Sequence, residues 1–269
     1  MTTDTTPYPT YDFLGLNLMP LDVAASAAAI VARAPDAPFA YVSTSNAQHV
    51  VWMDRGVIPG LRRAHLKAWL RTNDSRVLRL IGSVLFGRRD MPVTCGSDLT
   101  VDLLKHHIGA DDTISVIGGD DVLATELRRQ FRFAALHQFQ PPMGLLKDPG
   151  ARAACVDFIV AHPARYVFIA CGYPQSELIA LETLERGGAV GTGLCIGSSL
   201  HFATGLVDRA PLWMQRLTLE WLHRLVINPR RQIRRIFYDS APMLWIAVKT
   251  RLGLRGHAVR ALDGPGRGA

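Results

Sequence analysis

The chain has 269 residues, of which 48% are hydrophobic and 20% are charged, so it can build a folded core and is not a disordered chain. The net charge is +7, and the excess lies in residues 206–269, which hold 12 Lys and Arg against 4 Asp and Glu, whereas residues 1–205 hold 18 against 19. This asymmetry indicates an anionic partner for the C-terminal region: nucleic acid, a phosphate-bearing ligand or an acidic lipid surface.

Short apolar runs alternate with helical patterns along residues 1–205. In chain order, the patterns predict a helix at 21–34, a strand at 39–44, a helix from residue 46, a helix at 98–107, a strand at 113–119, a helix at 120–131, a helix at 151–161, a strand at 165–172, a helix at 174–187 and a strand at 189–197. Strands that alternate with helices are typical of βαβ units. The expected fold is therefore of the α/β class, with a Rossmann-like parallel sheet covered by helices on both faces.

Ligands of such sheets bind beyond the carboxyl ends of the strands. The predicted strand ends therefore place four short segments around a site, namely residues 44–46, 118–120, 172–177 and 197–201. The Gly-Gly pair at 118–119 is compatible with a phosphate-binding turn. It is weak evidence for a nicotinamide cofactor, because dinucleotide sites use a GxGxxG motif that opens a helix.

Four polar side chains have ordinary structural interpretations. Three of them lie in these strand-end segments, and the fourth, Asp74, lies in another turn. Asp74, in "LRTNDSRVL", can form an Asx turn or a cap. Thr44 and Asn46 can cap the helix that follows them. Glu177 can favour the dipole of a helix as a first-turn acid. The residue pattern by itself leaves structural and catalytic roles open for all four.

The pattern changes after Gly205. Residues 211–227 are predicted to be helical, and Asn228 and Pro229 are typical of the N-cap and first position of a second helix. That helix carries three arginines beside an apolar stripe of Ile233, Ile236 and Phe237: Arg231, Arg234 and Arg235. Residues 243–248 ("MLWIAV") are expected to form a buried or interfacial patch. We therefore expect an α/β catalytic domain over 1–205 and a basic, amphipathic helical appendage over 206–269, with disorder after about residue 256.

Several classes of site lack their signatures. The sequence has no DxD motif, no HExxH or HxxxH pair and no GxSxG elbow, so neither a zinc site nor a metal-diphosphate clamp is expected. No two of the four cysteines have CxxC spacing, which predicts buried free thiols in a reducing compartment. The polar N-terminal stretch predicts no signal peptide, and no apolar run approaches the ~20 residues of a membrane span. These features favour a cytoplasmic protein that can touch a membrane without crossing it.

Several segments together resemble the WecG/TagA/CpsF glycosyltransferase family, from about Tyr11 to Phe237. The matching segments are "YDFLGLNLMPLDV", "STSNAQHVV", "GSDLTVDLL", "ISVIGG" and "CGYPQSELI". The most specific part is a C-terminal signature whose residues follow the family's order and spacing: Arg209, Ala210, Pro211, Trp213, Glu220, Trp221, Arg224, Leu225, Pro229, Arg231 and Arg235.

The resemblance implies inverting transfer of a sugar from a UDP donor to a polyprenyl-diphosphate-linked sugar in bacterial exopolysaccharide or cell-surface polysaccharide synthesis. It implies that Asp74 is the general base, with Thr44 and Asn46 positioning the substrate. The implied substrate-binding residues are Gly118, Gly119, Gly172, Pro174, Gln175, Ser176, Glu177, His201, Arg209, Arg224, Arg231 and Arg235. The arginines would neutralise diphosphate charge in place of a metal ion, so no cofactor is expected.

The implied acceptor carries an anionic diphosphate on an isoprenoid chain, which suits helices that are both apolar and rich in arginine. The resemblance therefore places the protein on the inner face of the cytoplasmic membrane, as a peripheral protein. Nucleic acid is not an expected partner, because the tryptophan and leucine pattern demands burial and does not interleave exposed aromatics with lysine. A homo-oligomer is left open.

Four positions depart from the family's pattern. Ser75 replaces the glycine of a DG turn after the second strand, Val93 replaces an arginine, Ser176 replaces a glutamine and His201 replaces an acid. These departures leave open a catalytically impaired member that binds a lipid-linked sugar or a partner transferase. A nucleic-acid-binding module and a nicotinamide-dependent reductase are the other two alternatives.

Overall fold

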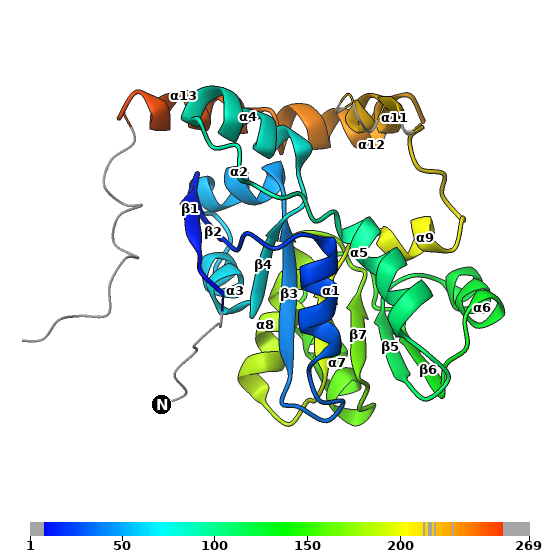
Figure 1. The fold of residues 1–269 in the computed structure, drawn as a ribbon. Helices are drawn as coiled ribbons and strands as arrows, with labels where there is room; N and C mark the ends of the chain where they lie inside the picture. The colour runs from blue at the N-terminus through cyan, green and yellow to red at the C-terminus, as the bar shows by residue number, and fades with distance from the viewer. Residues whose placement is uncertain (1–7, 212, 215–216, 218, 228, 255–269) are drawn as a thin grey trace, which may run out of the picture.

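The computed structural model describes residues 8–211, 213–214, 217, 219–227 and 229–254, with the backbone alone for Arg224 and Arg231. The described residues form a six-stranded sheet in the order β4-β3-β8-β7-β5-β6, and each neighbouring pair is parallel (Figure 1). The strands are β3 (Ala40–Ser45), β4 (Leu70–Asn73), β5 (Thr113–Ile117), β6 (Ala135–Phe139), β7 (Tyr166–Ile169) and β8 (Thr192–Cys195). The predicted α/β class with a parallel sheet is confirmed.

Helices cover both faces of the sheet. One face packs against α1 (Val23–Val31), α5 (Gly96–Asp102), the π-helical turn η1 (Leu103–His107), α6 (Asp121–Gln130) and α9 (Ser199–Ala203). The other face packs against α7 (Pro149–Ala161) and α8 (Gln175–Arg186), and α3 (Leu61–Lys67) lies beside α8. Alternate residues of one strand point to opposite faces, so Val42 joins the first core and Tyr41 the second.

The predicted strands at 39–44, 113–119, 165–172 and 189–197 are confirmed as β3, β5, β7 and β8. The central strand β7 is buried at every residue, as expected for a parallel strand covered on both faces. Two strands of the six-stranded sheet were not among those predicted from the residue pattern, namely β4 and the edge strand β6. The helices α3 and α4 (Arg76–Phe86) were also not predicted.

A third hydrophobic cluster lies beside the sheet. It joins the antiparallel pair β1 (Tyr11–Phe13) and β2 (Leu16–Leu18) to α2 (Ala47–Arg55), α4 and α13 (Pro242–Arg251). Its buried members include Leu16, Val50, Leu78 and Ile246. The patch expected at 243–248 is thus the middle of α13, which buries one side and exposes the other.

The region after Gly205 runs from α9 across the end of the molecule to α13 (Figure 1). Its helices are α11 (Glu220–Ile227), α12 (Pro229–Ile233), the π-helical turn η2 (Arg234–Tyr238) and α13. The predicted cap at Asn228 and the predicted disorder after residue 256 lie outside the described residues. Of the described helices, none is both long and apolar enough to cross a membrane.

The end of this region is bonded to the N-terminal half. The indole of Trp52 donates to Asp239 at 3.2 Å, and Arg55 donates to the carbonyl oxygen of Tyr238 at 2.7 Å. The domain boundary at residue 205 stays a prediction. The contacts of α13 and Asp239 argue against a clean separation, and removing residues after Pro229 would uncover part of the third cluster.

Candidate functional site

The end of β3 and the turn after it hold two of the predicted catalytic residues. Thr44 is buried, and its hydroxyl donates to the carbonyl oxygen of Cys195 at 3.2 Å, which ties β3 to β8. The side-chain oxygen of Asn46 accepts a hydrogen bond from the backbone N–H of Gln48 at 3.0 Å. Asn46 is therefore the N-cap of α2, as its ordinary interpretation predicted.

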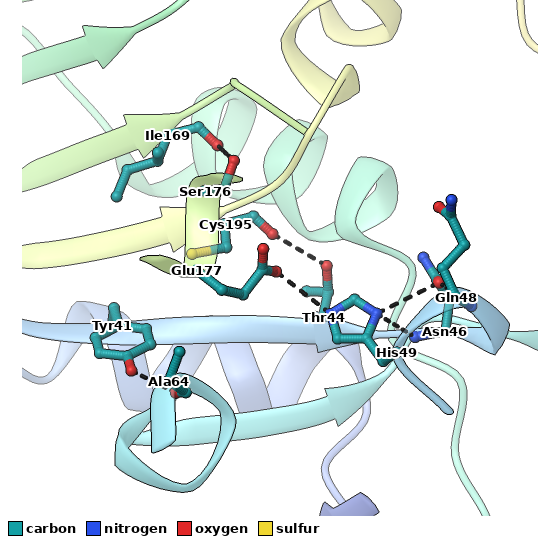
Figure 2. A network of polar contacts seen from close by, with 10 residues as sticks. All are labelled: Tyr41, Thr44, Asn46, Gln48, His49, Ala64, Ile169, Ser176, Glu177 and Cys195. Carbon is teal, nitrogen blue, oxygen red and sulfur yellow. Dashed lines mark hydrogen bonds and ion pairs between the residues drawn. The ribbon is translucent and has the colours of Figure 1, made fainter. Parts of the chain in front are cut away.

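His49 connects this turn to the first turn of α8 (Figure 2). Its Nδ1 accepts a hydrogen bond from the backbone N–H of Asn46 at 3.2 Å, and its Nε2 lies 3.3 Å from Oε1 of Glu177. Because Nδ1 is an acceptor, a neutral ring carries its hydrogen on Nε2 and donates it to Glu177. The two residues are 2% and 3% exposed, so this bond is shielded from water.

The ring of Tyr173 completes the cluster around His49. The two ring centroids are 3.8 Å apart. Burial raises the pKa of Tyr173 well above its ordinary value, and the nearby charge of Glu177 adds to the effect. The phenol therefore stays neutral, and the cluster links α2 to α8 through buried groups.

The turn after β4 presents Asp74. Its backbone N–H donates to the carbonyl oxygen of Ser45 at 2.7 Å, and its Oδ1 accepts from the backbone N–H of Gly96 at 3.1 Å. The local capping roles belong to its neighbours, because the hydroxyl of Ser75 caps α4 and the amide oxygen of Asn73 accepts from the N–H of Ser75. The side chain of Asp74 thus reaches across to α5 and is partly exposed.

Gly96 lies where side chains from the ends of β3, β4 and β8 come together. A Cβ atom at this position would lie 3.1 Å from the hydroxyl oxygen of Thr44 and 3.4 Å from that of Ser199. Thr44, Asp74 and Ser199 therefore surround the first residue of α5, and a side chain at this position would push on the hydroxyl groups of Thr44 and Ser199. Together they form the polar cluster at the carboxyl ends of β3, β4 and β8.

The Gly-Gly turn lies farther along the same edge of the sheet. Gly118 and Gly119 have φ angles of +99° and +72°, which side chains other than glycine rarely adopt. Asp120 then caps α6 by accepting from the N–H of Leu123. Three strands separate β5 from β4, a distance of about 19 Å between the outer two at ordinary strand spacing. A substrate that meets both Asp74 and this turn must be elongated.

The loop after β7 and the first turn of α8 contain five predicted substrate-binding residues. Gly172 has a φ angle of +77°, the peptide bond between Tyr173 and Pro174 is cis, and the amide of Gln175 turns back towards the carbonyl of Gly172. The hydroxyl of Ser176 donates to the carbonyl oxygen of Ile169 at 2.9 Å. Ser176 and Glu177 thus face the interior, so their contact with a substrate stays a prediction.

Comparison with known proteins identifies the family. A model described as the glycosyl transferase WecG/TagA/CpsF family matches residues 11–257. The chain belongs to this family. A relative from Bacillus subtilis (strain 168), N-acetylglucosaminyldiphosphoundecaprenol N-acetyl-beta-D-mannosaminyltransferase, is 40% identical over 65 residues. That segment is 24% of this chain and spans only 25% of the relative's length.

The match confirms the resemblance to the WecG/TagA/CpsF family and extends it. The resemblance runs from about Tyr11 to Phe237, whereas the family match continues to residue 257 and includes α13. It also includes every strand of the six-stranded sheet described above.

The arginines of the family signature occupy different environments. Arg209 lies 2.5 Å from Asp98 and 3.8 Å from Glu220, so it ties the segment after α9 to the first turn of α5. Arg224 and Arg231 lie in α11 and α12, and their side chains lie outside the described residues. Arg235 lies in η2. His201, at one of the positions that depart from the family pattern, lies in α9 and is partly buried.

Among the described residues, no group of three or more His, Cys, Asp and Glu could hold a metal ion. All four cysteines are unbridged, as predicted; Cys95, Cys155 and Cys195 are buried, whereas Cys171 is only partly buried. Burial raises the pKa of Cys155 to about 11 and that of Cys171 to about 12, so both stay protonated and unreactive at neutral pH.

Sequence reasoning did not identify His49, Gly96 or Ser199 as site residues. His49 and Gly96 stood inside segments that carried the family resemblance, and Ser199 stood inside a predicted strand-end segment. Their partners are distant in sequence, so only the fold shows what each contacts.

Proposed function

We propose that this protein is an inverting glycosyltransferase that moves a sugar from a UDP-sugar to a polyprenyl-diphosphate-linked sugar in exopolysaccharide or other cell-surface polysaccharide synthesis. Family membership supports sugar transfer. The name of the Bacillus subtilis relative supports a lipid-linked N-acetylglucosamine acceptor and an N-acetylhexosamine donor. The observation that carries the proposal is the placement of Asp74 among Thr44, Gly96 and Ser199 at the carboxyl end of the sheet.

Asp74 acts as the general base. In inverting transfer, the acceptor hydroxyl oxygen attacks the anomeric carbon of the donor from the side opposite the UDP group. The carboxylate of Asp74 takes the hydroxyl proton as the new bond forms, and UDP leaves with the electron pair of the broken bond. The hydrogen bond from Gly96 orients the carboxylate, and its partial exposure allows a substrate to reach it.

Charge on the departing UDP and on the acceptor diphosphate is neutralised by arginines of the C-terminal helices, Arg224, Arg231 and Arg235. Arg209 is paired with Asp98, which holds this region against α5, and its contact with a substrate stays a prediction. The donor extends along the sheet edge towards the Gly-Gly turn and the loop after β7.

Catalysis needs no metal ion in this proposal. Transfer activity should therefore persist after dialysis against EDTA, because the arginines supply the positive charge. Loss of activity on chelation, with recovery on addition of Mg²⁺ or Mn²⁺, would show that carboxylates hold an essential metal.

The protein works as a peripheral protein on the inner face of the cytoplasmic membrane. The supporting observation is that large apolar side chains of the C-terminal region are exposed, among them Trp213, Trp221, Ile233 and Phe237. Aromatic and aliphatic side chains beside arginines suit the boundary between headgroups and acyl chains.

The test is a transfer assay with purified protein, a panel of UDP-sugars and a short-chain polyprenyl-diphosphate-linked N-acetylglucosamine in detergent. The proposal predicts that one donor lengthens the acceptor by one sugar, detected by mass spectrometry. If no donor of the panel is transferred while the acceptor still binds, the protein is an impaired family member that binds lipid-linked sugar, as the changes at Val93, Ser176 and His201 would allow.

A further inference from the structure

Helix α4 exposes an apolar side although it lies in the N-terminal half of the chain. Leu80 and Val84 stand one helical turn apart and are 52% and 70% exposed. The opposite side of α4 is buried through Leu78 and Ile81. A single exposed leucine or valine is ordinary, but two on one stripe next to further exposed apolar residues form a patch.

The further residues belong to α13, which packs beside α4 (Figure 1). Both helices bury one side in the third cluster, α13 through Met243 and Ile246. Arg251 at the end of α13 donates to the carbonyl oxygen of Leu85 at 3.0 Å, which fixes the two helices together. Since neighbouring helices bury their inner sides in one cluster, their outer sides face outward together. The outer side of α13 exposes Leu244, Trp245 and Val248.

The charged side chains on these two helices have one sign, although the exposed Asp90 follows Arg89 in the segment after α4. Neither α4 nor α13 contains an Asp or Glu. Arg79 and Arg89 are exposed on and just after α4, and Arg251 ends α13. The ammonium group of Lys249 lies 5.1 Å from the centroid of the Trp245 ring. This arrangement suits the headgroup region, where the ring can contact apolar groups while the charge stays solvated.

We propose that α4 and α13 together form a membrane face that lies on anionic lipid, so that membrane binding is shared by the N-terminal half and the C-terminal helices. This inference rests on the proposed function. Exposed apolar side chains with basic side chains beside them, and no acid on either helix, fit the interface of an anionic bilayer. The face continues towards η2, where Phe237 is exposed.

The position of α4 gives this face a consequence for catalysis. Asp74 and the cap Ser75 lead directly into α4, and Leu80 lies about 8 Å along the helix from Ser75 at the rise of an α-helix. A lipid-bound α4 therefore holds the general base close to the headgroup layer. That layer is where the diphosphate and first sugar of a polyprenyl-linked acceptor reside.

The test compares two double variants for sedimentation with phosphatidylcholine vesicles that contain phosphatidylglycerol. Leu80→Ser with Val84→Ser removes the apolar stripe of α4. Val122→Ser with Met143→Ser is the matched control, because these side chains are also exposed but lie near the β6 edge of the sheet. The affinity of the α4 variant for the vesicles should fall by at least about tenfold, and the control should bind as wild type does.

Two further readouts separate this inference from the proposed function. The α4 variant should keep wild-type transfer to the short-chain acceptor in detergent, and Arg79→Gln with Arg89→Gln should weaken binding to anionic vesicles more than to pure phosphatidylcholine. One outcome is that neither wild type nor any variant transfers sugar while vesicle binding still depends on Leu80 and Val84. That outcome would support the membrane face and contradict the proposed function.

Two results would overturn the inference. One is vesicle binding by the α4 variant equal to that of wild type. The other is a change of oligomeric state in gel filtration with unchanged vesicle binding, which would assign the face to a second copy of the chain.

Discussion

The turn after β3 is bonded to buried polar side chains, whereas Asp74 in the adjacent turn after β4 reaches across to α5, although Asn46 and Asp74 are both partly exposed. In the first turn, Asn46 is bonded to His49, and His49 to the buried Glu177. In the second, the Asp74 carboxylate receives an N–H from Gly96 and reaches out of its own turn. A closed network fixes geometry, while a partly exposed carboxylate can exchange a proton with a substrate.

The largest expected effect comes from Asp74→Asn. The amide oxygen can still accept from Gly96, so the free energy of unfolding should change little, whereas kcat should fall by about 10²–10⁴-fold because no base remains. The matched control is Asp148→Asn, a carboxylate that also accepts one backbone N–H, at the cap of α7. Near-native turnover by Asp74→Asn would assign the base elsewhere.

Two substitutions test the two hydrogen bonds of His49 separately. In His49→Asn, the amide oxygen takes the place of Nδ1 and keeps the bond from Asn46, but Glu177 loses its donor. We expect a loss of about 3 kcal/mol in the free energy of unfolding, since a buried carboxylate is left unpaired, with kcat of the folded protein nearly unchanged.

His49→Gln is the complementary variant, because its amide nitrogen replaces Nε2 and keeps Glu177 bonded. It should cost about 1–2 kcal/mol and lower kcat about tenfold, since the Asn46 turn loses its inner acceptor. Urea unfolding and steady-state kinetics on the same preparations measure both effects. A merely structural role for His49 predicts that stability falls in both variants while kcat of the folded protein falls in neither.

The smallest effect concerns His65, which is buried near His49. Burial, with the charges of His49 and Arg71, lowers the pKa of His65 well below its ordinary 6.5. Below that pH the unfolded chain binds a proton that the folded protein does not. The contribution of neutral His65 to stability is therefore complete above about pH 6.5 and is lost as the pH falls, by up to about 1.4 kcal/mol per pH unit.

Urea unfolding at several pH values tests this. His65→Gln should flatten the acid side of the stability profile, while the exposed His106→Gln should leave it unchanged. An identical slope in wild type and His65→Gln would show that other groups cause the acid sensitivity. Such a result would leave the comparison of the two turns intact.

The sequence predicts the inner strands of the sheet, which are buried on both faces. Residues 166–169 are apolar throughout, so β7 is evident from sequence. The edge strand β6 places His137 and Gln138 in its centre, which hides its strand character. Helix α4 was also missed, although its apolar residues follow a clear helical period.

The candidate site was predicted less completely than the fold. The parallel sheet places Thr44 and Asn46 at strand ends, and the family resemblance singled out Asp74. The bond between His49 and Glu177 joins residues 128 positions apart, and no local pattern reports such a contact. The same holds for Gly96, whose importance comes from two hydroxyl groups on other strands or helices.

The most direct test of the difference between the two turns is the pH dependence of kcat for wild type and Asp74→Asn in one transfer assay. A general base must be ionised, so wild-type kcat should fall at acid pH, and Asp74→Asn should lose this acid limb at a rate about 10²–10⁴-fold lower. An acid limb in Asp74→Asn that matches wild type would contradict the account, because the proton would then be taken by another group.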